Sequence, residues 1–106
     1  MSSPQNAGEL LGYVGGPQLH DAEIVRVDDS GEDLRVVIAS ENDSKFLVSF
    51  TGVQSLISNK PEGMTLYGMA ELKGEPGHRR FVFVNWDEDD DARLEVSAVG
   101  YSMEKI

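Results

Sequence analysis

A-E-I-V-R-V-D-D-S-G-E-D-L-R-V-V-I-A, residues 22–39, is the stretch that decides the fold of this chain. Two apolar runs flank D-D-S-G-E-D, a cluster of residues that favour turns. In the second run Leu34, Val36 and Ile38 occupy every second position, which is the period of a strand with one buried face. The stretch therefore predicts an antiparallel β-hairpin.

Further runs of the same kind follow at intervals of roughly ten residues. In K-F-L-V-S-F the large apolar residues Phe46, Val48 and Phe50 share one face. Gly52 then indicates a bulge or a bend. R-R-F-V-F-V-N-W, residues 79–86, is apolar on both faces, which predicts a strand in the centre of a sheet.

We therefore predict an all-β fold, a single antiparallel sheet or sandwich of six to seven strands. The predicted strands span residues 22–28, 33–39, 45–50, 65–72, 80–86 and 93–100. The run E-L-L-G-Y-V forms either a short helical turn or an edge strand, because glycines and a proline follow it closely. Residues 1–8 are expected to be disordered, and residues 9–106 form a single β domain. The side chains expected in the core include Phe46, Val48, Phe83, Leu94, Val96 and Ala98.

The charge of the chain restricts its partners. Nineteen acidic residues stand against nine Lys and Arg, so the net charge is −10. Phosphate backbones and anionic membrane surfaces are disfavoured, because both need a cationic surface. Basic proteins and cations are the partners that such a field attracts. No secretory signal or membrane span is evident, which favours a cytoplasmic protein, and no cofactor motif or cysteine is present.

An acidic run dominates the region after the predicted central strand. It consists of Asp87, Glu88, Asp89, Asp90 and Asp91. The spacing partly fits an EF-hand loop, but Ala92 stands where that loop needs glycine and Ala98 where it needs a bidentate glutamate, so no metal site is assigned. We predict a solvated hairpin tip that also forms an acidic surface for a basic partner protein. The alternative is a weak divalent-cation module.

In an extended strand successive side chains point to opposite faces, so Asp87, Asp89 and Asp91 would share one face and Glu88 and Asp90 the other. Counter-charge would come from Arg93, with Arg79 or Arg80 as further candidates. Because like charges repel, replacing Asp89 and Asp90 is expected to leave stability unchanged or slightly higher.

His20-Asp21 is the second candidate pair. A His-Asp step could serve a small hydrolase, but such sites need further His and Asp ligands, and the chain has only one other histidine, His78. We predict a structural role, in which the Asp21 side chain accepts hydrogen bonds from turn amides. Trp86 is expected at the edge of the core.

The pattern L-H-D-A-E-I at residues 19–24, followed by a hairpin and F-T-G-V at residues 50–53, resembles a loose group of small bacterial β-rich proteins. Most members of that group are uncharacterised, and some resemble immunity proteins of polymorphic toxin systems. The resemblance implies a non-enzymatic β domain in which His20 and Asp21 are architectural.

The leading hypothesis is thus a small, non-enzymatic, acidic β protein that binds a basic protein, with an immunity-type inhibitor as one form of this role. The cation module at residues 87–91 and the hydrolase using His20 and Asp21 are the alternatives. Neither the oligomeric state nor the strand order follows from the sequence.

Overall fold

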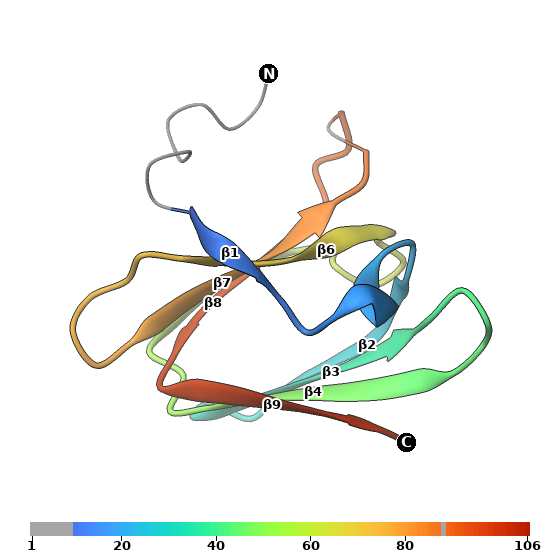
Figure 1. Ribbon diagram of the computed structural model, residues 1–106. Helices are drawn as coiled ribbons and strands as arrows, with labels where there is room; N and C mark the ends of the chain where they lie inside the picture. Colours follow the sequence, from blue (N-terminus) through green and yellow to red (C-terminus); the bar gives the residue numbers. More distant parts are fainter. Residues whose placement is uncertain (1–9, 88) are drawn as a thin grey trace.

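Within residues 10–87 and 89–106, the part of the chain that the computed structural model describes, nine strands and one 3-10 turn are formed (Figure 1). The elements are β1 (Leu10–Val14), η2 (Pro17–Leu19), β2 (Glu23–Asp29), β3 (Asp33–Ala39), β4 (Lys45–Thr51), β5 (Ser55–Asn59), β6 (Leu66–Leu72), β7 (Arg79–Asn85), β8 (Arg93–Ala98) and β9 (Gly100–Lys105). The prediction that residues 1–8 are disordered lies outside the described residues.

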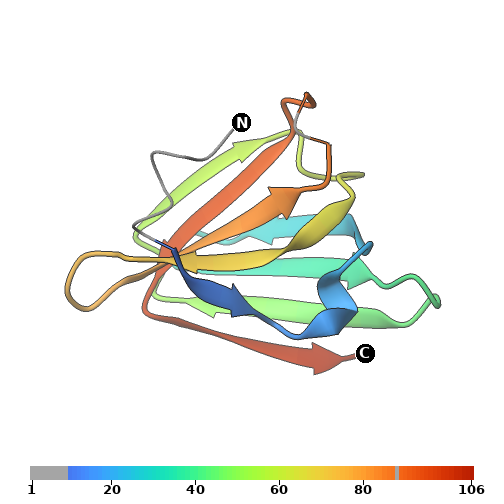
Figure 2. The ribbon, with the colours of Figure 1, turned by 45° about the horizontal axis from the view of Figure 1, so that its top comes forward.

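The strands form two antiparallel sheets that face each other as a sandwich (Figure 2). One sheet has five strands in the order β1-β6-β7-β8-β5, and the other has four in the order β2-β3-β4-β9. The chain passes between the sheets three times, after β1, after β4 and after β8, and the corners after β4 and β8 touch. Gly52 turns the corner after β4 with φ +63°, and the Val99 amide of the corner after β8 donates to the Thr51 carbonyl at 2.9 Å.

The core lies between the sheets and is filled by the alternate residues of the central strands. Phe50 of β4 is fully buried, and its ring lies 5.3 Å from that of Phe81 and 5.9 Å from that of Phe83, both on β7. Contacts of this kind join the two sheets. Every side chain predicted for the core is buried, because strand alternation places each of them on the inner face.

The all-β class and all six predicted strands are confirmed, each strand within two residues of its predicted ends. The hairpin at residues 22–39 forms as predicted, with Ile24 opposite Ile38. Three more strands are present: an edge strand is one of the two structures expected for the first, and the other two were not predicted. The run at Leu10–Val14 is an edge strand, Ser55–Asn59 is another, and the predicted strand 93–100 ends at Ala98 because the chain turns toward the second sheet and continues as β9.

Candidate functional site

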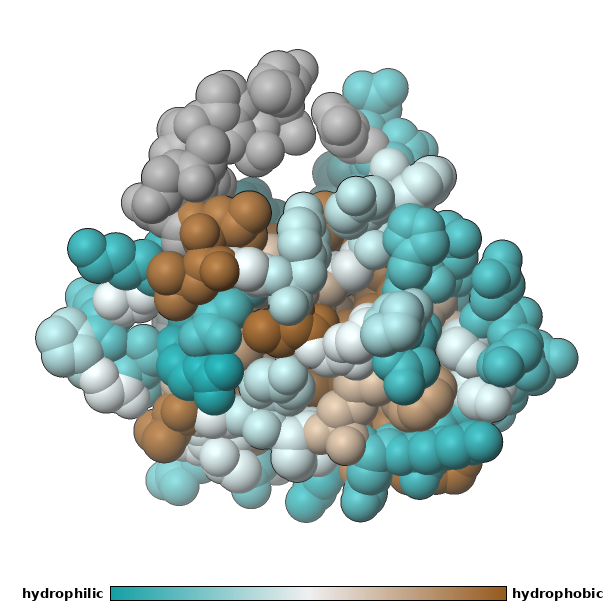
Figure 3. Space-filling model, viewed as in Figure 1, coloured by the Kyte–Doolittle hydropathy of each residue, from teal (hydrophilic) through white to brown (hydrophobic). Residues whose placement is uncertain are grey.

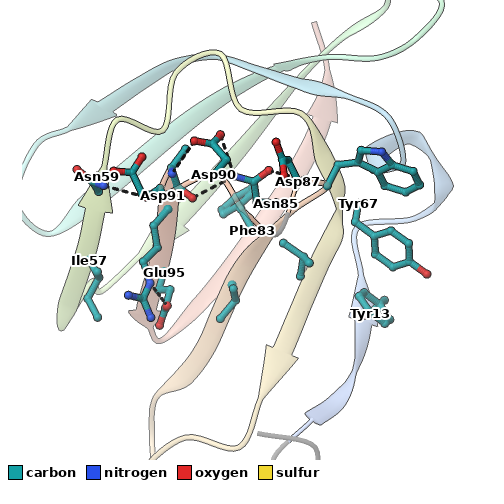
Figure 4. A pocket seen from close by; sticks show the side chains of 15 residues that line it. Tyr13, Ile57, Asn59, Tyr67, Phe83, Asn85, Asp87, Asp90, Asp91 and Glu95 are labelled. Atoms are coloured by element: carbon teal, nitrogen blue, oxygen red, sulfur yellow. Dashed lines mark hydrogen bonds and ion pairs between the residues drawn. The ribbon is translucent and has the colours of Figure 1, made fainter. Parts of the chain in front are cut away.

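The outer face of the five-stranded sheet, opposite the core, carries an open groove of about 930 Å³ (Figure 4). Its floor is formed by Val82 and Val84 of β7. These two residues point outward because their neighbours Phe81 and Phe83 point into the core. The central position predicted for this strand is confirmed, since β7 is the third of five strands. Its second apolar face, however, lies on the surface and is only half covered.

The walls of the groove come from β1, β5, β6, β8 and the segment between β7 and β8 (Figure 4). The tyrosines Tyr13 and Tyr67 stand on one flank and Ile57 on the other. The acidic segment closes one end with Asp87, Asp90 and Asp91, which follow β7 directly. Elements far apart in the sequence therefore build one concave surface that combines apolar, aromatic and acidic groups.

Aromatic rings form a connected cluster on one side of the groove. Tyr67 stacks on Trp86 with ring centroids 5.5 Å apart and an interplanar angle of 20°. Tyr13 meets the Tyr67 ring edge-on at 5.8 Å. Trp86 is 52% exposed, so the prediction that it lies at the edge of the core is wrong. The half-exposed rings offer flat apolar surface to a ligand.

The His20 ring packs against this aromatic cluster. It meets the rings of Tyr67 and Trp86 edge-on, each at 5.4 Å. Its Nδ1 lies 3.1 Å from the Tyr67 carbonyl oxygen, and because that oxygen can only accept, Nδ1 is the donor. The ring therefore ties the turn after η2 to β6.

Asp21 acts through its backbone. Its φ of +64° is left-handed, a conformation that aspartate tolerates better than most residues, and its amide donates to the Leu66 carbonyl at 2.9 Å. Its carboxylate lies 3.7 Å from His20 Nε2, and among the described residues no turn amide donates to that carboxylate. The structural role of the pair stays a prediction, but its basis shifts from the Asp21 side chain to the Asp21 backbone.

The acidic segment is a compact tip between β7 and β8, and it is not extended. The Asp90 amide donates to the Asp87 carbonyl at 3.2 Å, which closes a turn. Side-chain oxygens cap neighbouring amides: Asn85 accepts from Asp87, and Asp87 accepts from Asp89, both at 2.9 Å. The prediction that alternate carboxylates share a face is therefore wrong, since strand alternation does not apply in turns. Glu88 lies outside the described residues.

The Asp90 carboxylate accepts two hydrogen bonds at the base of this tip. It accepts from the Asn85 amide at 3.2 Å and from the Ala92 backbone amide at 3.3 Å. The hydrogen bond from Asn85 is the main reason that the pKa of Asp90 lies below its usual value. We therefore expect removal of Asp90 to destabilise the tip, in contrast to the sequence-based expectation.

The expected counter-charges are mostly engaged elsewhere. Arg93 pairs with Glu95 at 2.7 Å, and Arg79 pairs with Glu71 at 2.8 Å. Lys60, which the sequence did not single out, lies 3.4 Å from Asp91, but both side chains are about 70% exposed, so their attraction is weak. The tip therefore remains strongly negative.

Sequence reasoning missed the aromatic flank and the capping role of Asn85. Two signals were present in the chain. The alternation Val82, Val84, Trp86 marks an apolar second face, which indicates either a buried central strand or an apolar surface. The spacing of Asn85 and Asp87, each two residues before the amide that it caps, is typical of Asx turns.

Comparison with known proteins identifies no relative. No protein-family model, no curated protein and no solved structure matches the chain. Helices in the described part of the chain are all too short to cross a membrane. Across residues 10–87 and 89–106, no three His, Asp or Glu side chains are grouped so that they could hold a metal ion.

Proposed function

We propose that this chain is a non-enzymatic, cytoplasmic β protein that binds a basic protein, and that it acts as an immunity-type inhibitor by covering a basic surface of that protein. One observation carries the proposal: the acidic tip borders an exposed apolar and aromatic groove. An apolar patch rimmed by charge is typical of protein interaction surfaces.

The charge of the chain supports the same partner. A net charge of −10 on 106 residues attracts basic proteins over a distance and raises the rate of association more than the final affinity. Contacts in the groove would then supply the short-range part of the binding energy. This division predicts binding that weakens, but does not vanish, as salt is added.

The test compares proteins captured by the immobilised wild type and by two charge variants. The tip variant Asp89→Asn/Asp91→Asn removes two carboxylates whose side chains cap no backbone amide among the described residues. The control Glu41→Gln/Asp43→Asn removes the same charge from the exposed β3–β4 loop. Asparagine suits position 43, whose φ is +70°.

We expect a basic protein that the wild type and the control capture and that the tip variant captures less, with the difference reduced at high salt. Equal capture by the tip variant and its control would contradict the proposed role of the tip. The immunity role makes a separate prediction: the captured protein should inhibit growth when expressed alone, and co-expression of this chain should restore growth. A captured protein without toxicity would refute that part of the proposal.

A further inference from the structure

The groove has a chemical character that narrows the choice of ligand. Its floor is aliphatic, with Val82 and Val84 half-buried, and Ile57, which is 50% exposed, adds an aliphatic side chain on one flank. The apolar surface continues along β1, where Leu11 is 66% exposed, and Figure 3 shows hydrophobic side chains gathered over the start of that strand. An antiparallel sheet face turned to water is usually polar. An apolar face of this kind fits a partner segment with aliphatic side chains.

The charges that line the groove are unbalanced. Four carboxylates line it, those of Asp87, Asp90, Asp91 and Glu95, against one guanidinium, that of Arg93. Arg93 is already paired with Glu95 at 2.7 Å. Asp87 and Asp90 each cap backbone amides of the tip, but a carboxylate has about four acceptor positions and so retains capacity for an incoming donor. The groove is therefore complementary to a cation.

The aromatic flank favours a particular cation. Arginine stacks on aromatic faces and also donates to carboxylates through a planar fork, whereas lysine offers a single compact charge. Trp86 and Tyr67 are stacked on each other and half-exposed beside Asp87. We infer that the groove docks a segment of the basic partner in which an arginine is flanked by aliphatic residues. This inference rests on the proposed function and names the part of the partner that the groove recognises.

A second copy of the chain fits the groove poorly. A symmetric dimer would bring the same surface of both chains together, and with it both acidic tips. Each chain carries a net charge of −10, so this contact would be repulsive. Charge complementarity thus favours the basic segment.

Trp86 provides a direct assay, because it is the only tryptophan in the chain and lines the groove. Its fluorescence is followed during titration of the full chain with the peptide acetyl-Gly-Leu-Arg-Leu-Gly-amide. A second peptide carries citrulline, the uncharged analogue, in place of arginine. We expect a saturable change with the arginine peptide and an affinity about tenfold lower for the citrulline peptide, which lacks the charge.

A matched pair of variants locates the binding. Val84→Arg places bulk and positive charge on the floor of the groove, whereas Val37→Arg makes the same change on β3, in the middle of the other sheet, where the valine is also half-buried. Both variants change the net charge equally. Circular dichroism checks that both are folded. We expect Val84→Arg to weaken binding by about tenfold or more and Val37→Arg to change it by about twofold or less.

Several results would overturn the inference. These are the absence of a saturable signal up to millimolar arginine peptide, equal binding of the citrulline peptide, and equal effects of the two valine variants. A response to cellohexaose without one to the peptide would indicate a carbohydrate site instead. Dimerisation in sedimentation experiments that Val84→Arg abolishes would make a second copy the occupant. If the captured basic protein responds to the tip variant but not to Val84→Arg, this inference fails and the proposed function stands.

Discussion

Replacing Phe50 by alanine should remove a large part of the stability of the sandwich. Phe50 is fully buried on β4, and its ring lies within 5.3 to 6.1 Å of three others, those of Phe81, Phe83 and Tyr101. These rings come from both sheets. Phe50 therefore lies where the two layers meet, and its loss leaves a cavity between strands that cannot close without moving a whole sheet.

The size of the effect follows from this environment. Truncation of a buried phenylalanine to alanine costs about 3 to 5 kcal/mol. An aromatic pair adds about 0.5 to 1.5 kcal/mol of stability beyond the effect of its buried area. Because Phe50 has three ring neighbours, we expect Phe50→Ala to lie near the upper end of the range for buried phenylalanines, at about 4 to 5 kcal/mol. Small domains are stable by about 5 to 15 kcal/mol in total. The melting temperature should fall by about 15 to 30 °C.

Urea denaturation followed by circular dichroism measures this loss directly. Phe46→Ala is the matched control, because Phe46 lies on the same strand and face but is 9% exposed and outside the main core cluster. It should cost less than Phe50→Ala. If Phe50→Ala costs under about 2 kcal/mol, or no more than Phe46→Ala, the packing of the two sheets described here is wrong.

Three further predictions test single features. In the first, Glu71→Gln removes the ion pair in which the Arg79 guanidinium donates two hydrogen bonds to the Glu71 carboxylate. These hydrogen bonds lower the pKa of Glu71 below its usual 4.5. The pair therefore stabilises the fold above about pH 4.5, and this stabilisation is lost as the pH falls through the lower pKa of the folded state. The free energies of unfolding of the wild type and the variant should differ by about 1 kcal/mol at pH 7 and by less in acid. A difference that stays constant with pH in urea titrations would contradict this. Asp90→Ala should lower the melting temperature at low salt while Asp89→Ala leaves it unchanged, and equal effects would show that the tip hydrogen bonds do not matter. Gly52→Ala should cost about 1 to 3 kcal/mol in urea denaturation, because φ is +63° and the new methyl group would lie 2.6 Å from a valine carbon; a neutral effect would refute the tight contact of the two corners.

The sequence by itself determined the fold class and the central strands. Strand alternation is a local pattern, so Leu34, Val36, Phe83 and Val96 could be assigned to the core without knowledge of their neighbours. Two strands, Ser55–Asn59 and Gly100–Lys105, were not predicted, and the strand at Leu10–Val14 was predicted only as one of two alternatives; all three lie at sheet edges. Edge strands bury few side chains, so their sequences show no strong alternation. In Ser55–Asn59 the four residues other than Leu56 are exposed.

Only the tertiary structure decided whether the outward face of each strand is covered by another layer or lies on the surface. The period of two separates Val82, Val84 and Trp86 from the core residues between them, but it does not say whether another layer covers them. That depends on which strands pair and on where the chain passes between the sheets, after β1, at Gly52 and at Val99. The groove arises because β1, β5, β6 and β8 flank β7 and no further layer of the described chain covers this face. These are contacts between residues far apart in the sequence, so no local pattern contains them.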